Sequence, residues 1–282
     1  MTAKDDILQR AAVVLQQAGL EDPRREARLL LSWATHRDLA GLFALNVLSE
    51  DEANRFEAAV QRRASREPLA FITGETGFWT LDVFTSPETL IPRGDSEALI
   101  EALLIVRPDK GEALTMLDLG TGTGCLLLSA LSEYSRAWGV GVDLAPGAAL
   151  LAQRNAVRNG LEKRSAFLAG NWDSALNGQF DVVISNPPYI ESADVPDLMP
   201  EVSRYEPARA LDGGTDGLDA YRLLCDALPR LLVPEGHAIL EMGIGQIDAV
   251  SELGSRRGLK EVARHDDLGG IARALVLQRT EN

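Results

Sequence analysis

Four residues that follow an apolar run have the types needed to hold a flat nitrogen atom. Asn186, Pro187, Pro188 and Tyr189 come directly after residues 180–185. The amide carbonyl of Asn186 and a proline carbonyl can accept hydrogen bonds from the N–H groups of an amide or aromatic amine. The prolines stiffen the turn, and Tyr189 offers a flat face. We take Asn186, Pro187 and Tyr189 as candidate catalytic residues and all four as a candidate substrate site. A rigid turn that merely ends a strand is the alternative.

A glycine-rich turn follows another apolar segment, 114–119, which carries Asp118. The turn consists of Gly120, Thr121, Gly122, Thr123 and Gly124. Glycines let a chain turn sharply and approach a ligand closely. A dinucleotide fingerprint needs its third glycine at position 125, which is cysteine here. An acid beside such a turn suits a cationic amino group better than a phosphate.

The next strand candidate, 137–142, ends at Asp143. A carboxylate there can accept both hydroxyl groups of an adenosine ribose, and ligands of open α/β sheets bind beyond the carboxyl ends of the strands. The glycine turn, Asp118 and Asp143 together therefore predict a cofactor site. A tight structural turn with a solvent-exposed aspartate is the alternative.

Alternating strands and helices must position these groups. Helical stretches are predicted at 123–132, 146–159 and 217–230, with a looser segment at 170–178. This alternation predicts an α/β fold with helices on both faces of a mostly parallel sheet, whose last two strands are antiparallel neighbours. The seven strand candidates are 114–119, 137–142, 165–169, 180–185, 236–242, 259–264 and 272–278.

The first part of the chain has a different pattern. Residues 4–66 have apolar positions at helical spacing, with Asp22 and Ser49 as predicted N-caps. Glycines and prolines interrupt the next segment, where Phe71-Ile72 and 78–84 are predicted to be short strands that form a hairpin through Gly74-Glu75. We predict three parts: a helical domain at 1–66, a linker with a β-hairpin at 67–93 and the α/β domain at 94–282.

Composition excludes several classes of protein. The net charge of −14 disfavours a stand-alone nucleic-acid binder, because the chain repels a phosphate backbone. No apolar segment is long enough to span a membrane, and no basic leader precedes an apolar run. The two cysteines and three histidines are scattered, so we expect reduced thiols, no metal site and a cytoplasmic monomer.

The stretch from the glycine turn to Asp143 resembles the class I methyltransferase fold, a Rossmann-like seven-stranded sheet with its last strand reversed. This resemblance implies S-adenosyl-L-methionine as cofactor, with its methionine end at Asp118 and residues 120–124 and its ribose at Asp143. Methyl transfer is an in-line displacement, so the acceptor nitrogen must aim its lone pair at the methyl group. Asn186 is neutral, and we expect it to position the nitrogen while the proton leaves to water.

Further motifs narrow the resemblance to the peptide chain release factor glutamine methyltransferase family, over nearly the whole chain. One departure is Gly94, where the family usually has proline. The matching segments are 66–69, 72–74, 77–79, 90–93, 95–97, 186–189, 210–218 and 240–243.

This resemblance implies N5-methylation of the glutamine in the Gly-Gly-Gln motif of class-1 peptide chain release factors, with the helical domain docking the partner. It also implies that Trp172 and Asn186 contact the cofactor; a partly buried loop tryptophan is the alternative for Trp172. Two other functions stay open. One is a methyltransferase acting on adenine N6 or guanine N2 of nucleic acids, and the other is a non-enzymatic adaptor that binds S-adenosyl-L-methionine.

Overall fold

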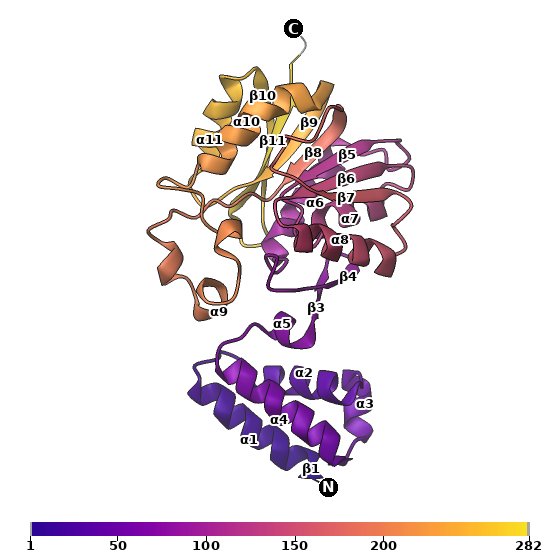
Figure 1. Ribbon diagram of the computed structural model, residues 1–282, viewed down its shortest axis with the longest axis vertical. Coiled ribbons are helices and arrows are strands. Elements are labelled where there is room, and N and C mark those ends of the chain that lie inside the picture. The colour runs from indigo at the N-terminus through magenta and orange to yellow at the C-terminus, as the bar shows by residue number, and fades with distance from the viewer. Residues whose placement is uncertain (1, 281–282) are drawn as a thin grey trace. The chain divides into compact units, whose positions relative to one another are not determined.

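The larger part of the chain is an open, seven-stranded sheet (Figure 1). The computed structural model describes residues 2–280. The strand order is β10-β11-β9-β8-β5-β6-β7. The strands are β5 (Thr115–Leu119), β6 (Trp138–Asp143), β7 (Ser165–Ala169), β8 (Phe180–Ser185), β9 (Leu232–Glu241), β10 (Leu259–Asp266) and β11 (Ala272–Arg279).

The sheet is mostly parallel, with one reversed strand. Strand β5 pairs in parallel with β6 and β8, and β6 and β8 pair in parallel with β7 and β9. Strand β11 runs antiparallel to both of its neighbours, β9 and β10. All seven predicted strands and the reversed direction of the last one are confirmed.

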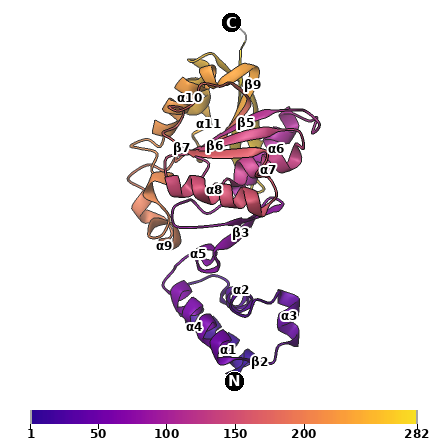
Figure 2. The ribbon, with the colours of Figure 1, turned by 45° about the vertical axis from the view of Figure 1, so that its right-hand side comes forward.

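Helices cover both faces of the sheet because neighbouring residues of a strand point to opposite sides. Met116 belongs to the buried cluster beneath one group of helices, and Leu117 belongs to the cluster on the other face. Figure 2 shows the two groups on either side of the strands. One group is α6 (Glu97–Val106), α7 (Cys125–Glu133) and α8 (Pro146–Arg158), and the other is α10 (Asp219–Leu231) and α11 (Ile247–Ser255).

The predicted helices at 123–132, 146–159 and 217–230 correspond to α7, α8 and α10. The looser segment 170–178 forms turns without a helix. Helix α11 was not predicted, since it is short and has only two large buried apolar side chains, Ile247 and Val250.

The hairpin lies further along the chain than predicted. Its strands are β3 (Glu75–Phe78) and β4 (Leu81–Phe84), so the turn is at 79–80 and the predicted turn at Gly74-Glu75 is wrong. The predicted strand at Phe71-Ile72 is also wrong, because these residues belong to helix α5 (Leu69–Thr73). Pro68 begins this short helix, and Gly74 ends it with a φ of 81°.

A smaller compact unit contains the N-terminal helices. Two predicted N-caps are confirmed: the Asp22 side chain accepts from the Arg25 N–H at 3.1 Å, and Ser49 forms a reciprocal capping box with Glu52. Its elements are β1 (Thr2–Ala3), α1 (Lys4–Gln17), α2 (Pro23–Thr35), α3 (Leu39–Ala44), β2 (Val47–Leu48), α4 (Glu50–Ala64), α5 and α9 (Pro200–Ser203).

Residues 199–205 join this smaller unit although they are distant in sequence. The Arg63 side chain is buried and donates to Glu201 at 3.0 Å and to Glu26 at 2.5 Å. Thus one unit comprises residues 1–75 and 199–205, and the other comprises 76–198 and 206–282. The three domains predicted from the sequence, at 1–66, 67–93 and 94–282, therefore stay a prediction.

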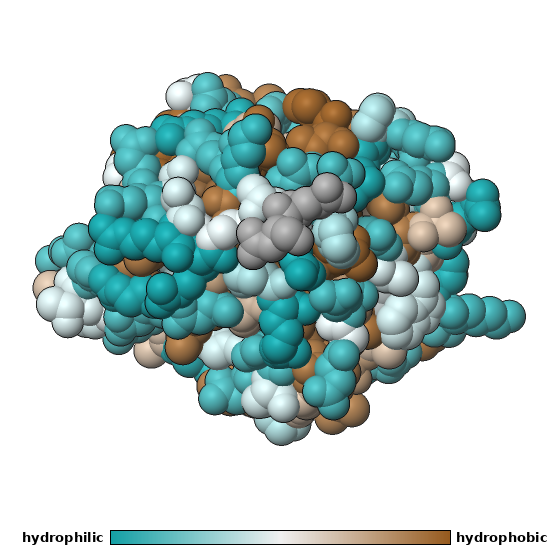
Figure 3. Space-filling model, turned by 90° about the horizontal axis from the view of Figure 1, so that it is seen from above, coloured by the Kyte–Doolittle hydropathy of each residue, from teal (hydrophilic) through white to brown (hydrophobic). Residues whose placement is uncertain are grey.

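One face of the molecule is shown as a space-filling view in Figure 3. The face seen in Figure 3 is mostly hydrophilic, and its apolar residues lie in small separate groups. Within residues 2–280, no helix has the length and apolar character that crossing a bilayer requires.

Gly141 in β6 supplies a test of the packing beneath the glycine turn. A Cβ atom at this position would lie 2.5 Å from the Phe167 ring and 2.6 Å from Thr121 Oγ1. We expect Gly141→Ala to reduce the free energy of unfolding by about 1–3 kcal/mol, since overpacking forces the neighbours to move. Urea denaturation measures the change. Gly77→Ala is the control because its Cβ would meet no atom within 4 Å. Equal midpoints for both variants would contradict the packing described.

A Gly94→Pro variant tests the position at which this chain departs from the family pattern, which usually has proline there. It begins a short 3-10 helix, and Arg93 before it has φ −106° and ψ 142°, which a following proline requires. We expect Gly94→Pro to raise the free energy of unfolding by about 0.4–1 kcal/mol, because proline restricts the unfolded chain. Gly270→Pro, at a φ of 75°, should destabilise the protein. A lower urea midpoint for Gly94→Pro would show that the backbone here does not suit proline.

Candidate active site

A cavity of about 310 Å³ lies at the carboxyl ends of the central strands. Residues that follow β5, β6, β7 and β8 line it, as expected for an open α/β sheet. Eight of the predicted site residues line it together: Gly120, Thr121, Gly122, Thr123, Asp143, Trp172, Asn186 and Pro188. Four do not line it: Asp118, Gly124, Pro187 and Tyr189.

The glycine loop, residues 120–124, turns sharply between β5 and α7. Gly120, Gly122 and Gly124 have φ values of 77°, 54° and 80°. This left-handed region is accessible to glycine and strained for most other residues, which explains the spacing of the glycines. The N–H groups of Gly120 and Thr121 both donate to the Val142 carbonyl, so the loop is tied to the end of β6.

Asp118 lies beneath the glycine loop and is completely buried. Its Oδ2 accepts from the Thr121 hydroxyl at 2.6 Å, while its Oδ1 has no hydrogen-bond partner among residues 2–280. Burial raises the pKa of the Asp118 carboxyl to about 7, and the hydrogen bond from Thr121 opposes this shift. Because Asp118 does not line the cavity, its carboxyl group supports the glycine loop from beneath through Thr121 in this structure.

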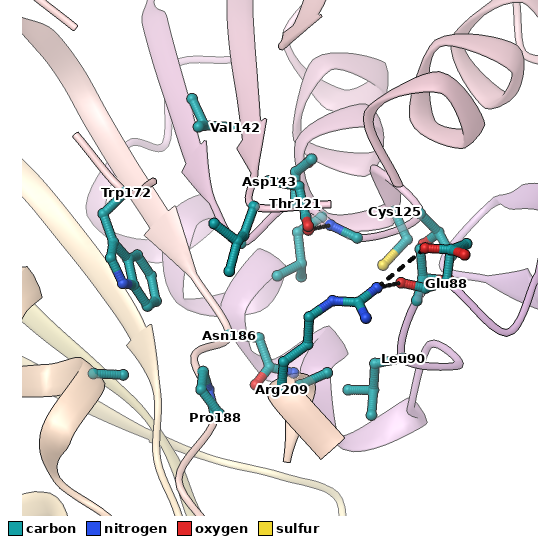
Figure 4. Close-up of a pocket in the computed structure, with 18 of the residues that line it drawn as sticks. Glu88, Leu90, Thr121, Cys125, Val142, Asp143, Trp172, Asn186, Pro188 and Arg209 are labelled. Carbon is teal, nitrogen blue, oxygen red and sulfur yellow. Dashed lines mark hydrogen bonds and ion pairs between the residues drawn. The ribbon is translucent and has the colours of Figure 1, made fainter. Parts of the chain in front are cut away.

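Asp143, the last residue of β6, binds the backbone of the glycine loop and of the segment before α8. Its Oδ2 accepts from the Gly122 N–H at 2.8 Å, and its Oδ1 accepts from the Ala145 N–H at 2.9 Å. Each carboxylate oxygen has a further lone pair. Both oxygens of Asp143 can therefore still accept hydrogen bonds from the hydroxyl groups of a ligand in the cavity. Trp172 lies across the cavity from Cys125 in Figure 4, and its φ is 49°.

The Asn-Pro-Pro-Tyr turn, residues 186–189, follows β8. Asn186 donates from Nδ2 to Ser96 Oγ at 3.2 Å, and no hydrogen bond from the described residues occupies Asn186 Oδ1. The turn packs closely against Gly213, where a Cβ atom would lie 2.9 Å from the Pro188 carbonyl oxygen. Only glycine fits there, so the segment 210–218 supports the turn.

Tyr189 faces away from the cavity, although the sequence suggested a flat face for the substrate. Its hydroxyl donates to Glu241 Oε1 at 3.1 Å, and its ring packs against the buried cluster under α10 and α11. Its carbonyl accepts from Gln246 Nε2 at 2.9 Å. In this structure Tyr189 therefore fixes the turn from behind.

Several lining residues were not assigned by the sequence reasoning. Arg209 reaches across the cavity to the Glu88 carbonyl at 2.5 Å and to its carboxylate at 3.4 Å (Figure 4). Leu90 and Arg93 also line the cavity. Leu90 and Arg93 belong to the Leu-Ile-Pro-Arg segment, residues 90–93, and Glu88 lies two residues before it. The match of this segment to the family pattern was the available signal.

Asn155 was also missed. This fully buried side chain in α8 donates to the carbonyl groups of Phe84 and Thr123 at 3.1 and 2.8 Å and accepts from the Phe84 N–H at 2.7 Å. It thus fastens the end of the hairpin to the glycine loop. A polar residue in an otherwise apolar helix position was the signal.

Cys125 also lines the cavity. Burial raises the pKa of its thiol to about 12, so the thiol stays protonated at neutral pH. Cys125 and Cys225 are both free thiols, in agreement with the sequence expectation, and Cys125 is only half-buried.

Solved structures share the fold. A methyltransferase from Pyrococcus furiosus superposes with a TM-score of 0.53 at 17% identity, covering 81% of this chain and all of that one. The hMettl16 catalytic domain superposes with a TM-score of 0.57 at 14% identity, covering 83% of this chain and 82% of that one. At these identities the likeness concerns the fold alone.

Family models match both parts of the sequence. The PrmC N-terminal domain model matches residues 6–74, and the methyltransferase small domain model matches residues 95–203.

Among curated relatives, the release factor glutamine methyltransferase of Rhodospirillum rubrum is 45% identical over 97% of this chain and 84% of its own length. That of Geobacter sulfurreducens is 42% identical over 93% of this chain and 91% of its own length. Identity of this extent, over both matched parts, shows that the chain belongs to the release factor glutamine methyltransferase family.

Proposed function

We propose that this protein transfers a methyl group from S-adenosyl-L-methionine to N5 of the glutamine in the Gly-Gly-Gln motif of class-1 peptide chain release factors. One observation carries the chemical part of the proposal: Asn186 and the glycine loop line the same cavity. The names of the relatives supply the substrate.

The residues around the cavity fit the cofactor. Asp143 lines the cavity and suits the ribose hydroxyl groups. The carboxyl group of Asp118 has the charge that suits a cationic amino group, although it lies beneath the glycine loop and does not line the cavity in this structure. Trp172 would lie along the adenine, and the glycine loop would lie along the methionine end. When bound, S-adenosyl-L-methionine supplies a methyl group on a positively charged sulfur.

The turn at 186–189 would orient the glutamine. Asn186 Oδ1 would accept one N–H of the glutamine amide, and the Pro187 carbonyl would accept the other, although Pro187 does not line the cavity in this structure while Asn186 and Pro188 do. These contacts hold the nitrogen with its lone pair toward the methyl group and offset the positive charge that grows on nitrogen. Because Asn186 is neutral, it does not take the proton, which leaves to water after transfer.

The partner and the location follow from the same proposal. We propose that the helical domain docks the release factor, that the protein acts as a monomer and that it works in the cytoplasm, where translation takes place. Direct nucleic-acid recognition is disfavoured by the net charge of −14.

The substrate is tested by mass spectrometry of a class-1 release factor after incubation with the protein and labelled S-adenosyl-L-methionine. We expect one added methyl group, on the glutamine of the Gly-Gly-Gln motif, and no label on a Gln→Ala release factor. Naked RNA and DNA serve as competing substrates. Robust transfer to either nucleic acid, with none to the release factor, would favour the exocyclic-amine alternative instead.

The role of Asn186 is tested by Asn186→Ala. We expect kcat to fall by about 10²–10³-fold, because the variant loses a preorganised acceptor at the reacting nitrogen, while circular dichroism and the urea midpoint stay close to those of the unmodified protein. Asn177→Ala is the matched control, since Asn177 is exposed and does not line the cavity. An undiminished kcat for Asn186→Ala would remove Asn186 from the mechanism. Because any measurable methyl transfer shows an enzyme, it would also exclude the non-enzymatic adaptor.

A further inference from the structure

The side-chain amide of Gln246 lies behind the Asn-Pro-Pro-Tyr turn and has no part in the mechanism described so far. Gln246 stands directly before α11, but within the described part of the chain its side chain does not cap that helix. Its Nε2 instead donates to the Tyr189 carbonyl at 2.9 Å and, less closely, to the Gly217 carbonyl at 3.4 Å. Its Oε1 accepts from the Gly243 N–H at 3.1 Å. The amide therefore joins the residues after β9 to two segments that are distant from them in sequence.

Two glycines make room for this amide. A Cβ atom at Gly217 would lie 2.5 Å from Gln246 Nε2 and 2.4 Å from the Tyr189 carbonyl oxygen. A Cβ atom at Gly243 would lie 2.4 Å from Gln246 Oε1. Gly217 also has a φ of 69°, which glycine adopts without strain. A side chain at either position would push Gln246 away from Tyr189, so the backbone is shaped around the amide.

The turn depends on contacts from other segments because proline has no N–H group. Pro187 and Pro188 cannot donate backbone hydrogen bonds, so the two middle residues cannot close the turn by themselves. The Tyr189 carbonyl lies at the end of the turn, and Gln246 supplies a donor to it. Each proline ring fixes φ at about −65°, so a displacement of Tyr189 is passed along the turn to Asn186. Holding the Tyr189 carbonyl therefore also fixes where Asn186 Oδ1 lies.

Gln246 acts from outside the cavity. It does not line the cavity, whereas Asn186 and Pro188 of the turn do. A change at Gln246 can therefore alter the direction of Asn186 Oδ1 while every group that lines the cavity is retained. A reaction that relies on orientation is sensitive to such a change, since a misplacement of about 1 Å that starts far from the chemistry can cost about 10²-fold in rate.

We propose that Gln246 is a positioning residue for methyl transfer: its side-chain amide holds the Tyr189 carbonyl and thereby fixes the turn that aims Asn186 at the acceptor nitrogen. The Gly243 N–H sets the direction of the Gln246 amide, because an N–H group binds the oxygen end and leaves the nitrogen end for the Tyr189 carbonyl. This inference rests on the proposed function, and it adds a residue that acts through the turn without contacting cofactor or substrate.

Kinetics of Gln246→Glu test the inference. This substitution keeps the shape of the side chain but replaces the donor with an oxygen that faces the Tyr189 carbonyl. We expect kcat for release-factor methylation to fall about ten- to a hundredfold, while KM for the release factor and Kd for S-adenosyl-L-methionine stay within about twofold. In the Asn186→Ala background, the same substitution should cost much less in single-turnover rate, since the group that it misplaces is absent.

Gln179→Glu is the matched control. Gln179 is exposed, precedes β8 at the end away from the turn, and also donates from Nε2 to a backbone carbonyl, that of Arg230, at 3.4 Å. We expect its kcat to stay within about twofold of that of the unmodified protein. If circular dichroism shows that Gln246→Glu does not fold, Gln246→Met, which is similar in length and has no N–H group, decides. A normal kcat for the folded Gln246 variant, an equal loss for Gln179→Glu, or losses that multiply in the Asn186→Ala background would overturn the inference.

A second measurement separates this inference from the proposed function. The side-chain amide resonances of Asn186, assigned in ¹⁵N-labelled protein by their loss in Asn186→Ala, report the surroundings of this group without any substrate. We expect the Gln246 variant to shift these resonances and Gln179→Glu to leave them in place. If the resonances shift as expected but the unmodified protein methylates no release factor, the proposed function fails alone. If methylation proceeds but the resonances do not respond, the inference fails alone.

Discussion

The parallel pairing of β5 with β6 and β8 is the constraint on which the site depends. Leu119 pairs with Val142, and Asp118 pairs with Ile184, so the carboxyl ends of all three strands reach the same edge. The glycine loop, Asp143 and Asn186 follow these ends directly, and the cavity results from this register. A shift of one residue in either pairing would reverse the faces of every side chain in a strand, and the apolar clusters on both sides of the sheet prevent it.

Contacts from distant segments then give the cavity its shape. Asn155 binds the hairpin to the glycine loop, Gly213 lets the segment 210–218 pack on the Asn-Pro-Pro-Tyr turn, and Ser96 reaches Asn186 from the other side. Each of these residues is buried or closely packed, so the groups that line the cavity are held from behind. This arrangement is what a reaction that relies on orientation requires, since no strong base or metal is assigned to it.

Most of the architecture follows from patterns that are local in the chain. Apolar runs identified all seven strands, and capping residues such as Ser49 located helix ends. The hairpin was predicted in the wrong place because Phe71-Ile72 is too short to distinguish a strand from one turn of helix. Pro68 and Gly74 lie at the two ends of this segment and favour the helix. The site was predictable where residues follow strands directly. Tyr189 contacts Glu241, and Ser96 contacts Asn186, only in the folded chain. Nothing in the local spacing of these residues indicates which way their side chains point.

The central claim is that one cavity holds the methyl donor against the glycine loop and a flat amide nitrogen against Asn186. A crystal structure of the protein with S-adenosyl-L-homocysteine and a peptide containing Gly-Gly-Gln measures this directly. We expect the glutamine amide nitrogen to lie about 2.7–3.2 Å from Asn186 Oδ1, on the side that faces the homocysteine sulfur. A glutamine bound elsewhere, or an Asn186 amide turned with its nitrogen toward the cavity, would contradict the account.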